Sequence, residues 1–151
     1  FDEHTLQKLW PYFEKADRII GFNSEHFDLP ILNRYYTGDL SVIEHLDLLK
    51  VIKEQSGKRY KLDDLAKSTL GKQKSASGLQ AIEWYHQGKI DLIKEYCEQD
   101  VRVTKELYEF GLLNKQVFIE TLTGERQPIT VSFDRAASAQ KKEGMNLTLP
   151  F

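Results

Sequence analysis

The stretch that decides the fold is Arg18–Leu32, with the sequence RIIGFNSEHFDLPIL. Its first part, RIIGF at 18–22, is a short apolar run rich in β-branched residues and predicts a buried strand. Polar residues follow, and Asp28 then opens a segment of helical character. Because α/β proteins usually bind ligands beyond the carboxyl ends of their strands, this order predicts a ligand site around Asn23 and Asp28. The competing interpretation is that Asp28 is only a helix cap, which is a common role for an aspartate before a helix.

A long helix, predicted over about 89–112, carries a second unusual feature. Its inward stripe repeats at helical spacing through Ile93, Tyr96, Cys97, Asp100, Thr104, Leu107 and Tyr108. Asp100 lies in the middle of this stripe, where burial of a carboxylate is unfavourable unless a cation or hydrogen-bond donors compensate it. Tyr96 lies one turn earlier on the same face, so its hydroxyl can approach the Asp100 carboxylate. Pairing of Asp100 with a buried arginine, or capping of a neighbouring backbone, is the alternative, and Cys97 is expected in the core.

The rest of the sequence predicts further helices and a C-terminal hairpin. Helices are expected over 4–16, 28–36, 46–55, 62–70 and 79–86, and hairpin strands over 117–122 and 129–133. Pro11 should kink the first helix or delay its start, and Asp47 is a candidate cap of the third. Trp10 and Trp84 are expected to anchor the core.

The bulk properties are those of one soluble domain with no strong charge. The chain has 151 residues, with 21 basic against 23 acidic side chains and a net charge of −2. It therefore lacks a global basic field for nucleic acid, and any such binding must rest on local residues. A single cysteine excludes an internal disulfide and fits a cytoplasmic setting, and no apolar run suggests a membrane partner. We expect one domain over 1–133 and a polar tail over 134–151.

Two groups of basic residues are candidates for phosphate contacts. The first is Lys58, Arg59 and Lys61 around Tyr60, and the second is Lys67, Lys72 and Lys74 beside the small-residue loop 71–78. A basic patch with an aromatic residue can bind a phosphate backbone, so Lys72 and Lys74 are expected to bind nucleic acid, although solvated surface lysines are the commoner explanation. The histidines at 26, 45 and 86 share no ligand-like spacing, and we expect surface or supporting roles for them.

Two segments together resemble motifs of the DEDD class of 3′–5′ exonucleases. Gly21–Leu32 (G-F-N-x-x-x-F-D-x-P-x-L) resembles their second exonuclease motif, which also occurs in the proofreading domains of family B DNA polymerases. Tyr96–Asp100 (YCEQD) resembles the third motif, Tyr-x-x-x-Asp, of the tyrosine (DEDDy) subclass. The similarity spans about 18–112, and the segments LDDLAKSTLG and KSASG resemble stand-alone, ribonuclease H-like exonucleases found beside helicase modules.

The resemblance implies an α/β, ribonuclease H-like exonuclease fold, N-terminally incomplete and helix-rich, with a C-terminal β-hairpin. It implies hydrolysis of single-stranded DNA or RNA from the 3′ end by two Mg²⁺ or Mn²⁺ ions that clamp the scissile phosphate. Asp28 and Asp100 would be metal ligands, and Tyr96 would orient the attacking water. Asn23 and Phe27 would line the slot for the terminal nucleotide. A helicase or polymerase module is the partner that the resemblance suggests.

The family's first motif, Asp-x-Glu on the first strand, has no convincing counterpart. Asp2 and Glu3 are adjacent, and adjacent side chains in a strand point to opposite faces. The 25 residues between Asp2 and Asp28 leave room for one helix, where the family has two strands and a helix. We therefore expect that the chain starts after the first strands of the sheet, holds one weakly bound Mg²⁺ at best and has little or no nuclease activity as given. A bare sheet edge would also favour self-association.

Two other hypotheses fit the same sequence. One is a non-catalytic ribonuclease H-like module that binds single-stranded nucleic acid, and an Asp-x-Glu strand encoded upstream would argue against it. The other is a structural α/β domain in which Asp28 caps a helix and Asp100 pairs with an arginine. That domain would gain no stability from Mn²⁺, whereas a metal site would gain stability by mass action.

Overall fold

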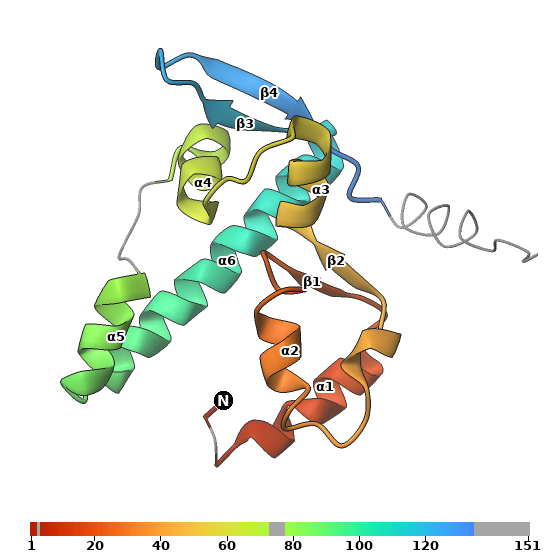
Figure 1. The fold of residues 1–151 in the computed structure, drawn as a ribbon, viewed down its shortest axis with the longest axis vertical. Helices are drawn as coiled ribbons and strands as arrows, with labels where there is room; N and C mark the ends of the chain where they lie inside the picture. The colour runs from red at the N-terminus through yellow and green to blue at the C-terminus, as the bar shows by residue number, and fades with distance from the viewer. Residues whose placement is uncertain (3, 73–77, 135–151) are drawn as a thin grey trace, which may run out of the picture.

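The computed structural model describes residues 1–2, 4–72 and 78–134. They form a parallel strand pair, a long diagonal helix and an antiparallel hairpin (Figure 1). In chain order the elements are η1 (Leu6–Lys8), α1 (Trp10–Lys15), β1 (Ile19–Gly21), α2 (Asp28–Leu32), η2 (Leu40–Val42), β2 (His45–Asp47), α3 (Leu48–Ser56), α4 (Leu62–Leu70), α5 (Gly78–His86), α6 (Ile90–Asn114), β3 (Gln116–Glu120) and β4 (Arg126–Thr130). The expected α/β, helix-rich class with a C-terminal hairpin is confirmed, and no described helix is long and apolar enough to cross a bilayer.

The N-terminal segment is broken where one helix was expected. A short 3-10 turn precedes α1, and Pro11 occupies the first turn of α1. Proline is favourable there because its fixed φ suits a helix start and its missing N–H would have no partner. Trp10 is buried and packs on Tyr36, with 5.2 Å between ring centroids, so its expected anchoring role is confirmed.

The strand β2 was missed, because residues 46–47 were assigned to a helix. It has only three residues, too few to show a period of two, and it pairs in parallel with β1. Gly21 lies opposite Asp47 in this pair, so both strands end at the same edge. The loop after β1 and the start of α3 therefore lie next to each other (Figure 1).

Gly21 allows the loop after β1 to fold back over the end of the strand. A Cβ added at Gly21 would lie 2.1 Å from Ser24 Oγ, which no side chain permits without movement. Ser24 is itself buried, and its Oγ lies 3.0 Å from His45 Nε2 on β2. The glycine at the start of the GFN segment therefore sets the path of the chain toward Asn23 and Asp28.

The core lies between the hairpin, α3, α4 and the C-terminal half of α6. Its buried residues are Leu46, Leu48, Ile52, Leu65, Leu107, Val117, Ile129, Val131 and Phe133. Gly111 of α6 lets the Phe133 ring approach the helix backbone, because a Cβ at this glycine would lie 2.3 Å from the ring. Close packing at this point fixes the end of α6 and thereby the direction in which the helix crosses the molecule (Figure 1).

The N-terminal half of α6 is less covered than its stripe predicted. Cys97 is exposed and Trp84 of α5 is only half-buried, so both expectations of a core position were wrong. The contacts of this half of α6 include α5, and Trp84 makes an edge-to-face contact with Tyr96 there. Helical spacing identifies a face, but it does not say how many elements will cover that face.

Candidate functional site

A cavity of about 620 Å³ lies between the loop after β1, the start of α4 and the middle of α6. The residues that line it are Gly21, Phe22, Asn23, Phe27, Asp28, Leu49, Arg59, Tyr60, Lys61, Leu62, Asp63, Gly78, Tyr96, Cys97, Asp100 and Thr104. The structure thus brings together all five residues that were predicted from the two motifs. They come from segments more than 60 residues apart in the sequence, which only the tertiary fold could join.

Tyr96 and Asp100 interact on the cavity wall, as their spacing on one helix face predicted. Partial burial, then the negative charge of Asp100 and a hydrogen bond to its carboxylate, raise the pKa of Tyr96 to about 12. Asp63 adds to this effect through its own charge. A phenol with this pKa stays protonated at neutral pH, so it can donate a hydrogen bond but cannot act as a base.

Asp28 lies in the first turn of α2, beside the cavity. The N-cap position belongs to Phe27, which makes no side-chain capping bond, so Asp28 is not the cap that the competing interpretation required. Partial burial of its carboxyl, and then the negative charge of Asp47, raise the pKa of Asp28. A cation next to Asp28 would offset both effects, because it favours the ionised carboxylate.

Asp63 is a third carboxylate at this cavity, and the sequence reasoning missed it as a site residue. It lies in the first turn of α4, where an acidic side chain suits the helix dipole and needs no functional explanation. The structure places it on the cavity wall with Asp28 and Asp100. No spacing signal could have found it, because α4 reaches the site through its packing on α6.

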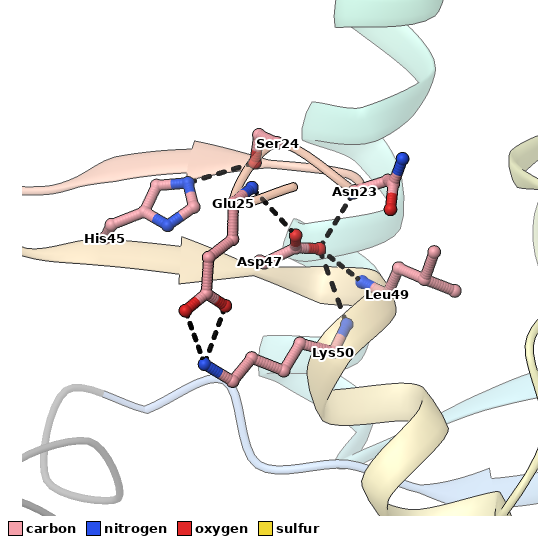
Figure 2. Close-up of polar contacts among 7 residues, drawn as sticks. All are labelled: Asn23, Ser24, Glu25, His45, Asp47, Leu49 and Lys50. Atoms are coloured by element: carbon pink, nitrogen blue, oxygen red, sulfur yellow. Dashed lines mark hydrogen bonds and ion pairs between the residues drawn. The ribbon is translucent and has the colours of Figure 1, made fainter. Parts of the chain in front are cut away.

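Asp47 holds the loop that carries the site residues. It is buried, and its carboxylate accepts N–H groups from Asn23 at 2.8 Å, Glu25 at 3.0 Å, Leu49 at 3.0 Å and Lys50 at 3.4 Å (Figure 2). The predicted capping of α3 is therefore confirmed, and the same side chain also ties α3 to the loop after β1. Asn23 adopts a left-handed backbone with φ of 60°, a conformation that asparagine tolerates better than most residues.

A second group of possible metal ligands includes two residues of this loop and Asp47. Side-chain ligand atoms of Glu25, His26 and Asp47 all lie within 4.8 Å of one another, although the sequence spacing had given His26 no such neighbours. Both Asp47 oxygens already accept backbone N–H groups, and Glu25 pairs with Lys50 Nζ at 2.6 Å (Figure 2). The charge of this group is thus already compensated within the protein, although among the described residues it is the one group of three candidate ligands whose atoms lie this close together.

Some of the basic residues singled out in the sequence line the cavity, and others form ion pairs elsewhere. Arg59 and Lys61 line the cavity on either side of Tyr60. Lys72, which was expected to bind nucleic acid, instead forms an ion pair with Glu106 and does not line the cavity. Lys74 lies outside the described residues.

Asp2 does not contribute to the cavity. Its carboxylate accepts hydrogen bonds from Thr5 Oγ1 at 2.8 Å, Thr5 N at 2.9 Å and His4 N at 3.0 Å. These contacts close a local turn and lower the pKa of Asp2, with the Thr5 hydroxyl as the main cause. This arrangement agrees with the rejection of Asp2 and Glu3 as the Asp-x-Glu motif, and Glu3 itself lies outside the described residues.

The carboxylates that line the cavity are of the chemical type that binds a hard divalent cation, although among the described residues Asp28, Asp63 and Asp100 do not form a group whose ligand atoms all lie within 4.8 Å of one another. Asp28, Asp63 and Asp100 offer carboxylate oxygens, which are the ligands that Mg²⁺ and Mn²⁺ prefer. The raised pKa of Asp28 also agrees with a cation site, because partial burial and the nearby charge of Asp47 disfavour the ionised carboxylate and a bound cation would stabilise it. Arg59 and Lys61 on the same wall could contact an anionic group such as a phosphate.

Comparison with known proteins connects this arrangement to one family. A family model, RNase_H_2, described as RNase_H superfamily, matches residues 2–111. No curated protein and no solved structure gave a significant match. The matched range covers more than half of the chain and contains every predicted residue that lines the cavity. The chain therefore belongs to the RNase H superfamily, whose members are generally metal-dependent hydrolytic nucleases.

Proposed function

We propose that this chain forms part of a metal-dependent 3′–5′ exonuclease that hydrolyses single-stranded DNA or RNA. One observation carries the proposal: Asp28, Tyr96 and Asp100 line a single cavity. These are the residues that the resemblance to DEDDy exonucleases assigns to catalysis, and they come together from two motifs far apart in the sequence. Membership of the RNase H superfamily supports a nucleic-acid substrate.

In this proposal Asp28 and Asp100 would hold the divalent cation, and Asp63 lines the same cavity as a further carboxylate. A bound Mg²⁺ or Mn²⁺ lowers the pKa of coordinated water and neutralises charge on the scissile phosphate. The complete two-metal site of the family needs the Asp-x-Glu carboxylates as well. Among the described residues, the cavity is lined by three aspartates and no glutamate.

Tyr96 positions the attacking water in this proposal. With a pKa of about 12, its hydroxyl is protonated at neutral pH and can hold the water by a hydrogen bond. It does not remove the proton of that water, because the phenolate is scarcely populated at this pH. The hydrogen bond to Asp100 fixes the direction of the hydroxyl on the helix face.

Asn23 and Phe27 would bind the terminal nucleotide. The Phe27 side chain is 61% exposed beside the cavity, which is unusual for an apolar ring and suits stacking on a base. Asn23 lines the cavity, where its side-chain amide can donate and accept hydrogen bonds, and the bond from its backbone N–H to Asp47 holds the loop in place. Arg59 and Lys61 would contact phosphate on the same wall.

The test is hydrolysis of 5′-labelled single-stranded DNA and RNA in Mn²⁺, both by this chain and by the full-length product of its gene. Products shortened stepwise from the 3′ end are expected from the full-length product. Asp100→Asn should abolish them, because it removes a metal-binding charge from the cavity. Asp91→Asn is the matched control, since Asp91 is an exposed aspartate of the same helix that does not line the cavity.

The outcomes separate the proposed enzyme from its alternatives. Shortening that is lost in Asp100→Asn and kept in Asp91→Asn would support the exonuclease. Shortening that survives Asp100→Asn would place the chemistry elsewhere and contradict the proposal. Binding without shortening by either protein would favour the non-catalytic nucleic-acid-binding module.

A further inference from the structure

A run of basic residues follows the edge of the candidate site. Residues 50–61 contain five basic side chains, Lys50, Lys53, Lys58, Arg59 and Lys61, against one acidic side chain, Glu54. The whole chain has a net charge of −2, so this local excess is not a property of its composition. Gly57 ends α3 in a left-handed conformation with φ of 73°, which turns the chain so that Arg59 and Lys61 reach the cavity.

Part of this run lines a second cavity, of about 380 Å³, that adjoins the first. Lys50, Lys53 and Arg59 lie on its wall, together with His26 and Glu54. Three residues line both cavities: Asn23, Leu49 and Arg59. Arg59 therefore stands between the cavity with three aspartates and the cavity with three basic side chains.

The acids on the wall of the second cavity, Asp47 and Glu54, and the neighbouring Glu25 all interact with other groups of the protein. The Asp47 carboxylate is buried and accepts four backbone N–H groups, and Glu25 is paired with Lys50 (Figure 2). Lys53 and Arg59 are exposed, and the ion pairs that the structure describes include neither of them. Two exposed cations thus lie at the second cavity, and they favour an anionic ligand there.

We propose that the second cavity binds the phosphate backbone of a single-stranded nucleic acid whose 3′ end occupies the first cavity. The proposal rests on the proposed function in one respect, since that function places the terminal nucleotide beside Asn23 and Phe27. A strand that leaves the first cavity past Arg59 meets Lys53 next, whereas on α6 it would meet the carboxylate of Asp100. Continuity of the two cavities through Arg59 favours a strand over a free phosphate ion, which would need only one of them.

The experiment measures binding of a fluorescent single-stranded oligonucleotide by anisotropy in EDTA, so that neither metal binding nor hydrolysis contributes. Lys53→Gln with Arg59→Gln removes two phosphate contacts and should lower the slope of log affinity against log salt by about 1.4. Between about 50 and about 200 mM salt, the affinity of the unaltered chain should therefore fall about sevenfold more than that of the variant. The control, Lys8→Gln with Lys15→Gln, removes the same charge from exposed lysines that line neither cavity.

A reduced slope of log affinity against log salt in the Lys53/Arg59 variant, but not in the control, would support binding of the nucleic-acid backbone in the second cavity. Equal slopes in both variants, or no measurable binding of the oligonucleotide, would overturn it. Binding of a mononucleotide, measured in parallel, distinguishes a site for a single phosphate from a site for a nucleic-acid backbone. If the Lys53/Arg59 variant loses as much affinity for the mononucleotide as for the oligonucleotide, the second cavity is a site for one phosphate and the proposal is overturned. Because this binding experiment contains neither metal nor hydrolysis, failure of the exonuclease proposal would be seen in the hydrolysis experiment and not here.

Discussion

At the scale of single residues, the site depends on Asp47, which lies behind it and does not line its cavity. The residue is 4% exposed, and its carboxylate accepts backbone N–H groups from the loop after β1 and from the start of α3. The sequence predicted that Asp47 caps α3, because an aspartate before a helix is a recognisable cap. The sequence could not predict the contacts of Asp47 with the loop after β1, because they depend on the pairing of Gly21 with Asp47 across two strands.

Replacement of Asp47 by asparagine tests this role. The amide nitrogen cannot accept, so one or more buried N–H groups lose their partner, and the free energy of unfolding should fall by about 1–3 kcal/mol. Urea unfolding measures the change. Asp39→Asn is the control, because Asp39 is exposed and its side chain caps one short turn through Ser41, and it should change stability much less. Equal effects of the two replacements would show that the Asp47 contacts add nothing beyond a local cap.

His45 should make stability depend on pH. Burial is the main cause of its lowered pKa, so the folded protein takes up its proton at a lower pH than the unfolded chain, whose histidine has a pKa of about 6.5. This contribution to stability is present above about pH 6.5 and is lost as the pH falls below it, toward the pKa of the folded state. Denaturant unfolding at about pH 7.5 and about pH 5.5 should show a smaller loss of stability in His45→Gln than in the unaltered chain. The same loss in both would contradict the assignment.

At the scale of elements, the long periodic segments were predictable and the short ones were not. Helices α4 and α6 were predicted within a few residues, because their apolar spacing extends over several turns. The strand β2 was missed and α2 is shorter than the 28–36 expected, because three to five residues carry little periodic signal. Burial on α6 was only partly right, since Leu107 is buried whereas Cys97 on the same stripe is exposed.

Gly111→Ala tests how tightly α6 is fixed to the C-terminal segment. A Cβ there would overlap the buried Phe133 ring, and overpacking of this kind costs about 1–3 kcal/mol. Alanine favours a helix over glycine by only about 1 kcal/mol, so the net effect should be loss of stability in thermal or urea unfolding. Val101→Ala, on an exposed position of the same helix, should be near neutral. A stabilised Gly111→Ala protein would show that the helix and Phe133 are not in close contact.

At the scale of the whole molecule, the candidate site is an assembly of distant segments. The two motifs supplied Asn23, Phe27, Asp28, Tyr96 and Asp100, and the structure places all five at one cavity. Asp63 and Arg59 reach the same cavity through the packing of α4 and the loop before it, which no local pattern encodes. Lys72 was predicted to bind nucleic acid because it belongs to a basic cluster in the sequence. The sequence does not show that Lys72 pairs with Glu106 in the folded protein.

Direct binding of Mn²⁺ is the measurement that tests the central claim, namely that these carboxylates form one metal site. Electron paramagnetic resonance of free Mn²⁺ in the presence of the chain should show bound ion for the unaltered protein and for Asp91→Asn. Asp28→Asn combined with Asp100→Asn should lose that binding, with circular dichroism used to confirm that the variant is folded. Unchanged Mn²⁺ binding by the folded double variant would contradict the account, because the ion would then be held by residues outside the proposed site.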